Sequence, residues 1–267
     1  MWLLIIAAAG MAPAAAFFYM KMPACWLCEF DEWPGEMHLA GLRGRMGIPG
    51  IWAAGTVTVF LSARLLCTVE WSPAADSVRW LAVLTACRGL AAGAVCAAAA
   101  VSLGIIILSD MEYMIIPDVP LLTAGAATLL MPLTSGAEAA ARWTGLGASA
   151  SGGITGAGAW MFAASVNILK EIAGVLAGAA GGGLALLLCM LLSALFYGRP
   201  AIGTGDLKLM LVCGALTGSF TGGVMVFVLS TLFSGIYMSL GLIAGKLSSG
   251  SLLPMAPFII LSTAVLL

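Results

Sequence analysis

Two short acidic motifs contain the residue types that can do chemistry in this sequence. Residues 109–118 (SDMEYMIIPD) place Asp110 directly after a long apolar stretch, and residues 203–208 (GTGDLK) place Gly205 immediately before Asp206. Two carboxylates around one water share a proton, so one acts as general base on the water and the other as general acid on a carbonyl. If the fold brings Asp110 and Asp206 together, the motifs predict aspartic-protease chemistry.

The composition identifies the class of protein that must position these acids. Of 267 residues, 62% are hydrophobic and 9% are charged, and the mean hydropathy is +1.10. Soluble domains carry about 25% charged residues, so the composition excludes a soluble enzyme, a nucleic-acid binder and a disordered chain. The sequence predicts a polytopic membrane protein, in which ionisable groups at membrane depth are costly and therefore candidates for function.

The apolar runs predict an all-α membrane bundle of about eight transmembrane helices, since about 20 apolar residues span the hydrocarbon. The runs lie near 2–19, 50–67, 82–109, 119–138, 172–197, 207–220, 222–245 and 252–267, with a turn at 218–223. We therefore divide the chain into a first transmembrane helix (1–19), a short cytoplasmic loop domain (20–49) and a helical membrane domain (50–267).

The flanks of the first run predict the orientation of the bundle. No basic residue precedes this run and Lys21 follows it, which favours a membrane anchor whose N-terminus faces outward. The segments 20–49, 110–118, 198–206 and 246–251 would then face the cytoplasm, so both acidic motifs would lie at one membrane face. The Gly/Ala/Ser-rich stretch 139–170 is predicted to be a flexible outer loop or a re-entrant segment.

The residues around the two acids have local roles that the sequence suggests. Pro117 disfavours helix in the residue before it, so we expect a break there and a new helix that begins with Asp118 as a cap or first-turn acid. Gly203 and Gly205 permit open backbone and close approach of an extended peptide. Lys208 has two interpretations: an interfacial anchor, or a cation that acts on Asp206, an acidic substrate residue or a lipid phosphate.

Two further groups of residues are interpreted as packing residues. Glycines recur on two predicted helices, at 174, 178 and 182 and at 214 and 218, and small residues on one helix face let neighbouring backbones approach closely. Five cysteines in or beside apolar runs are expected to be buried core residues and not a disulfide framework, namely Cys67, Cys87, Cys96, Cys189 and Cys213.

Both acidic motifs resemble those of the type IV prepilin peptidase family, the membrane Gly-x-Gly-Asp aspartic proteases. In that family the first aspartate stands six residues before Ile-Pro-Asp/Asn, as Asp110 does here, and the second lies in Gly-x-Gly-Asp-x-Lys-Leu, as in residues 203–209. Residues 253–258 (LPMAPF) are similar to a third family motif. The resemblance covers roughly residues 80–267.

The resemblance implies a function, a location and a catalytic pair. It implies that Asp110 and Asp206 are catalytic and need no cofactor for peptide cleavage. The implied substrates are type IV prepilins or type II secretion pseudopilins, cut after the glycine of the leader peptide. The implied location is the bacterial inner membrane, with the active site at the cytoplasmic face.

Many members of the family also methylate the new N-terminus with S-adenosylmethionine, and a loop after their first helix holds two Cys-x-x-Cys pairs. Cys25 and Cys28 resemble the first pair, but residues 46–49 (MGIP) contain no cysteine where the second is expected. A structural zinc site needs four ligands, and the candidates beyond the cysteines are His38 with Asp31, Glu32 or Glu36. Zinc is therefore not expected, and methyl transfer is left open.

Two other functions remain as alternatives. A presenilin-like intramembrane protease shares Gly-x-Gly-Asp, although the Ile-Pro-Asp spacing after Asp110 argues against it. A small proton-coupled transporter would use the acids as a relay, but it would place them near mid-membrane in repeated halves, and the sequence has no internal repeat.

Overall fold

The structure is a computed structural model that describes residues 13–17, 19, 55, 57–58, 79–147, 155–198, 202–245 and 253–267. These described residues are mostly helical and include no strand. The helices with defined bounds are α3 (Arg79–Tyr113), α4 (Asp118–Gly147), α5 (Thr155–Tyr197), α6 (Thr204–Leu216), α7 (Phe220–Ile243) and α8 (Ala256–Leu266). The predicted all-α class is confirmed for this part of the chain, whereas the loop at 20–49 lies outside it.

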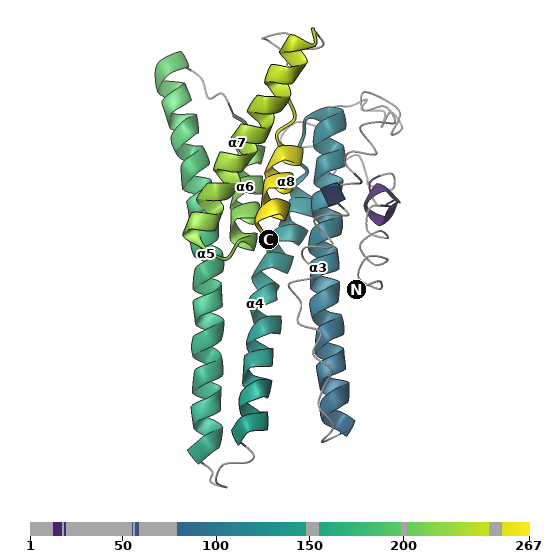
Figure 1. The fold of residues 1–267 in the computed structure, drawn as a ribbon, viewed down its shortest axis with the longest axis vertical. Coiled ribbons are helices and arrows are strands. Elements are labelled where there is room, and N and C mark those ends of the chain that lie inside the picture. Colours follow the sequence, from purple (N-terminus) through teal and green to yellow (C-terminus); the bar gives the residue numbers. More distant parts are fainter. Residues whose placement is uncertain are drawn as a thin grey trace.

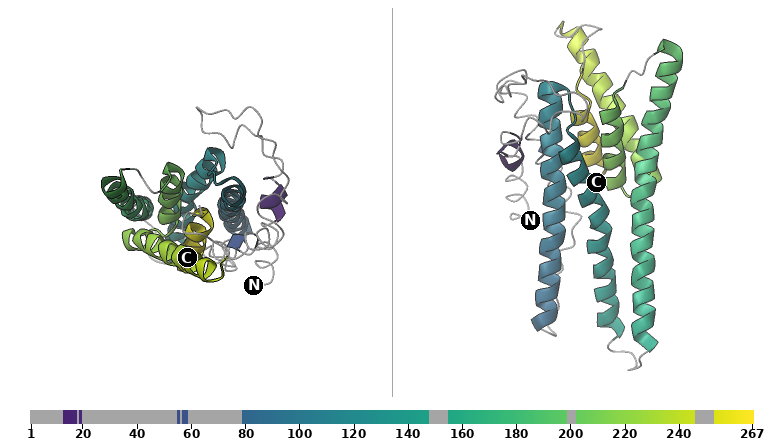
Figure 2. Two further views of the ribbon diagram at one scale, coloured as in Figure 1. Left: turned by 90° about the horizontal axis from the view of Figure 1, so that it is seen from above. Right: turned by 180° about the vertical axis from the view of Figure 1, so that it is seen from behind.

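Successive helices run in alternating directions (Figure 1). Helix α3 packs against α4, α5 packs against α4, α6 and α7, and the short α8 contacts α3, α6 and α7. The end of α3 and the beginnings of α4, α6 and α8 therefore lie at one end of the bundle, the upper end in Figure 1 and in the right-hand view of Figure 2. This end contains both acidic motifs.

Three helical segments among the described residues are long and apolar enough to cross a membrane: Ala91–Tyr113, Ser165–Tyr197 and Phe220–Ile243. The predicted eight spans are thus not confirmed. The runs expected at 207–220 and 252–267 form helices of only 13 and 11 residues, about 20 and 17 Å long at ~1.5 Å per residue. Each is shorter than the ~30 Å hydrocarbon core, and both helices pack among longer ones.

Two predicted connections differ from the structure. The stretch 139–170 is mostly helix and not a loop, since α4 continues to Gly147 and α5 begins at Thr155. Alanine, the strongest helix former, offsets the glycines and serines in this stretch. The turn expected at 218–223 is shorter, because Ser219 caps α7 by accepting a hydrogen bond of 3.1 Å from the Gly222 N–H.

The predicted helix break before Pro117 is confirmed, because α3 ends and α4 begins on either side of a short turn. Met114 adopts the left-handed backbone, with φ 58°, and its N–H donates a 2.9 Å bond to the Asp110 carbonyl. The Ser109 hydroxyl donates a 2.9 Å bond to the Ile115 carbonyl. These bonds fix the turn that follows Asp110.

Glycines bring α5, α6 and α7 into backbone contact, as the four-residue spacing predicts. A Cβ on Gly178 would collide with the Gly214 carbonyl, and a Cβ on Gly174 would collide with the Gly218 carbonyl. A Cβ on Gly223 of α7 would collide with the Gly178 carbonyl. The position of α6, and with it the second acidic motif, depends on these contacts.

The outer faces of α5 and α7 are apolar and exposed, which fits a surface in contact with lipid. Their exposed large side chains include Leu184, Leu188, Leu191, Leu195, Leu232, Ile236 and Leu240. Cys96 and Cys213 are buried as predicted, whereas Cys189 is only partly buried. The side chains of Cys67 and Cys87 lie outside the described residues.

Replacing Gly178 by alanine should destabilise the bundle, because the added methyl group collides with a backbone carbonyl that cannot rotate away. We expect the free energy of unfolding to fall by about 1–3 kcal/mol, as for overpacked cores, when measured for the purified protein in one detergent. Gly235→Ala is the matched control, because nothing lies within 4 Å of a Cβ there. Equal stability of the two variants would contradict the packing argument.

Candidate active site

Asp110 lies in the last turn of α3 and is only 4% exposed. This corrects the prediction that it directly follows the helix, because α3 continues through Tyr113. Its Oδ2 accepts a 2.9 Å hydrogen bond from the backbone N–H of Ala256, which is 146 residues away in the sequence and opens α8. The first N–H groups of a helix have no partner within the helix, so Asp110 satisfies one of them.

Asp206 lies in the first turn of α6, as the sequence predicts, and is partly buried. Burial raises the pKa of Asp206 above its ordinary value, and a backbone hydrogen bond with Gly203 opposes this rise only in part. Asp206 is also close enough to Asp110 for the two carboxyl groups to interact electrostatically. The fold therefore brings the two predicted acids together.

The two glycines around Asp206 differ in what the fold requires of them. Gly203 has φ −73° and ψ 154°, an ordinary extended conformation that does not require glycine. Gly205 is helical, and a Cβ on it would lie 3.3 Å from the Cβ of Ile116 in the turn between α3 and α4. Gly205 thus lets α6 approach the turn that follows Asp110. Pro117 is buried in the same turn.

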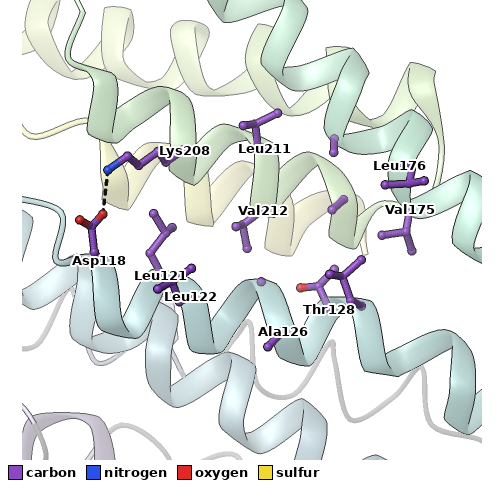
Figure 3. A pocket seen from close by; sticks show the side chains of 14 residues that line it. Asp118, Leu121, Leu122, Ala126, Thr128, Val175, Leu176, Lys208, Leu211 and Val212 are labelled. Carbon is purple, nitrogen blue, oxygen red and sulfur yellow. Dashed lines mark hydrogen bonds and ion pairs between the residues drawn. The ribbon is translucent and has the colours of Figure 1, made fainter.

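Lys208 connects α6 to α4 through Asp118. Residues two positions apart on a helix face different directions, and the Lys208 Nζ forms a 2.8 Å ion pair with Asp118 Oδ1, 90 residues away in the sequence. Figure 3 shows this pair bridging α4 and α6. Asp118 is the first residue of α4, as predicted, and its charge also links the two helices.

Glu112 is a buried acid whose partner the sequence analysis did not identify. It is 4% exposed, and its Oε2 accepts a 2.7 Å hydrogen bond from the Tyr19 hydroxyl. Its Oε1 is buried and has no hydrogen-bond partner among the residues that the structure describes. Glu112 lies two residues beyond Asp110 on α3, so the two side chains point in different directions. The bond from Tyr19 to Glu112 links the N-terminal segment to α3. The sequence offered one indication of this pairing: Tyr19 stands at the end of the apolar run 2–19, where its hydroxyl needs a polar partner.

The predicted metal-binding residues Cys25 and Cys28, with His38, lie outside the described residues. Among the residues that are described, no group of three or more His, Cys, Asp or Glu side chains is arranged to hold a metal ion. In the part of the chain that the structure describes, the candidate site comprises Asp110, Asp206 and the backbone groups of Ala256 and Gly203.

Comparison of the chain with protein families, with curated proteins and with solved structures gives no significant match. The functional argument therefore depends on the geometry. Two carboxyl groups that interact electrostatically, one of them hydrogen-bonded to a helix N-terminus, disfavour simultaneous ionisation, so one can stay protonated while the other accepts a proton from water.

Tyr19→Phe should destabilise the protein, because it leaves the second oxygen of buried Glu112 without a partner. The expected loss is about 1–3 kcal/mol in the free energy of unfolding. The double variant Tyr19→Phe/Glu112→Leu removes both polar groups and should recover most of this loss. A double variant less stable than Tyr19→Phe alone would contradict the assigned pairing.

Proposed function

We propose that this protein is a membrane aspartic endopeptidase that resembles the type IV prepilin peptidases and cleaves the leader peptide of prepilins or pseudopilins after glycine. One observation carries the proposal: the Ala256 N–H donates to the Asp110 carboxylate, beside Asp206. Three sequence motifs suggest the family, and a residue from each takes part in this bond or in the electrostatic interaction between the two acids.

The proposed reaction uses the two carboxyl groups with one shared proton. The ionised carboxylate removes a proton from water as the water oxygen attacks the scissile carbonyl carbon, and the protonated carboxyl group donates its proton to the carbonyl oxygen. The tetrahedral intermediate then collapses, the C–N bond breaks, and the leaving nitrogen takes a proton from the pair. No covalent intermediate with the protein forms.

The substrate must present an extended segment, because helical carbonyls are occupied by hydrogen bonds. Both acids lie beside helix ends and a turn, at the end of the bundle where α3 finishes and α6 and α8 begin (Figure 1). Gly203 and Thr204, next to Asp206, are exposed, so a peptide can approach the acid from this side. In the proposed orientation this end faces the cytoplasm of a bacterial inner membrane.

Asp110→Asn and Asp206→Asn should each abolish cleavage of a co-expressed prepilin, because an amide can neither accept the proton of water nor share one. We expect a loss of about 10²–10⁴-fold or more in the cleavage rate. Glu171→Gln is the matched control, because it removes an exposed carboxylate on α5.

The readout is the mass of the product's N-terminus, which reports cleavage and any methyl transfer to the new amine together. Folding is checked for each variant by thermal unfolding in detergent. A folded Asp110→Asn or Asp206→Asn variant that still processes the prepilin would refute the assignment. Processing of a mid-membrane helical substrate instead of a prepilin would favour a presenilin-like protease.

The pH dependence of kcat/KM should be bell-shaped, with limbs that belong to the pair and not to either residue. As the pH falls, both carboxyl groups become protonated and the general base is lost. As the pH rises, the shared proton is lost, and because burial raises the pKa of Asp206, this limb should lie well above the ordinary Asp pKa of about 3.9. A flat profile from acidic to alkaline pH would contradict proton sharing.

A further inference from the structure

A hollow lies between α4, α5 and α6 and is separate from the acid pair. Its volume is about 670 Å³, within the ~300–1,000 Å³ typical of ligand pockets. Figure 3 shows the Asp118–Lys208 pair at one end of this hollow and Thr128, Val175 and Leu176 toward the other. We refer to it as the α4–α6 groove.

Gly125 leaves open space in the groove and does not serve a close helix contact. A Cβ on Gly125, which lines it, would meet only a methyl group of Val212, at 3.6 Å, an ordinary van der Waals distance. A Cβ on Gly178 would instead collide with backbone. The helices therefore do not require glycine at position 125, and its missing side chain leaves space open.

The groove is apolar along most of its length and charged at one end. Apart from Thr128 and the ion pair, its lining residues are apolar or glycine, and the Thr128 hydroxyl is occupied by a 2.8 Å bond to the Ala124 carbonyl. The charged end consists of Lys208 and Asp118, whose side chains are 45% and 26% exposed. A fitting ligand has an apolar tail and a charged head.

The length of the groove matches one leaflet of a bilayer. From Asp118 to Leu129, both of which line the groove, α4 rises about 17 Å at ~1.5 Å per residue. Half of the ~30 Å hydrocarbon core is about 15 Å. Leu176 of α5, on the wall of the groove, is also exposed and continues the apolar face that meets lipid.

We propose that the α4–α6 groove binds a phospholipid with a zwitterionic, primary-amine headgroup. One acyl chain of the phospholipid fills the apolar groove. The phosphate contacts the Lys208 ammonium, and the headgroup amine donates a hydrogen bond to Asp118. An anionic headgroup without an amine leaves the Asp118 charge facing the phosphate. A quaternary ammonium has no N–H to donate, so the charge pair distinguishes among these lipids.

The test uses the full chain in nanodiscs that contain equal amounts of phosphatidylethanolamine, phosphatidylglycerol and phosphatidylcholine with the same acyl chains. After delipidation, native mass spectrometry identifies the retained lipid. We expect a single phosphatidylethanolamine, retained at least about tenfold over the other two. No step involves peptide cleavage, so the result is independent of the proposed enzymatic function.

Three variants test the parts of the site. Gly125→Leu should abolish retention by filling the groove, whereas Gly235→Leu, at a position with nothing within 4 Å of a Cβ, should retain the lipid. Asp118→Asn should remove the preference for the primary amine, and Lys208→Met should reduce retention of all three lipids. Thermal unfolding checks that each variant is folded.

Equal retention of the three lipids by the unmodified chain would overturn the proposal, as would retention by a folded Gly125→Leu variant that matches that of the unmodified chain. A co-purified apolar peptide, or a second copy of the chain in the absence of retained lipid, would also overturn it and identify a different occupant.

Discussion

The hydrogen bond from the Ala256 N–H to the Asp110 carboxylate joins the last turn of α3 to the first turn of α8. A hydrogen bond to a charged group contributes about 1.5–3 kcal/mol, and breaking it would leave a buried carboxyl oxygen and a helix N–H unsatisfied. Helix α8 also packs against α6, which carries Asp206. The candidate site therefore depends on the seating of a short helix from the end of the sequence.

Backbone contacts made by small residues give this arrangement its rigidity. A Cβ on Gly214 of α6 or on Gly223 of α7 would collide with the Gly178 carbonyl of α5, so the three helices meet through backbone at these positions. Because α6 is short, it relies on its neighbours for its position. These packing contacts hold α6 in place, and they therefore also determine the position of Asp206 relative to Asp110.

The charged and polar groups at this end of the bundle are paired across long sequence separations. Asp110 pairs with α8, Glu112 with Tyr19, and Asp118 with Lys208. These three acids lie within nine residues of sequence but face three different neighbours, because helix rotation and the turn at Pro117 separate their directions. One acid serves the candidate active site, one holds the N-terminal segment, and one closes the α4–α6 groove.

The amino-acid sequence was sufficient to predict the helical class, the apolar surface, the helix break before Pro117 and the close approach of α5 and α6 at glycines, because each follows from composition or local spacing. It did not determine the helical continuation through 139–170, where alanine propensity outweighs glycine and serine, or the lengths of α6 and α8. The partners of Lys208, Glu112 and Asp110 were decided only by the tertiary structure. Which neighbour a side chain meets depends on how each helix is rotated and which helices it crosses, and no local pattern records this.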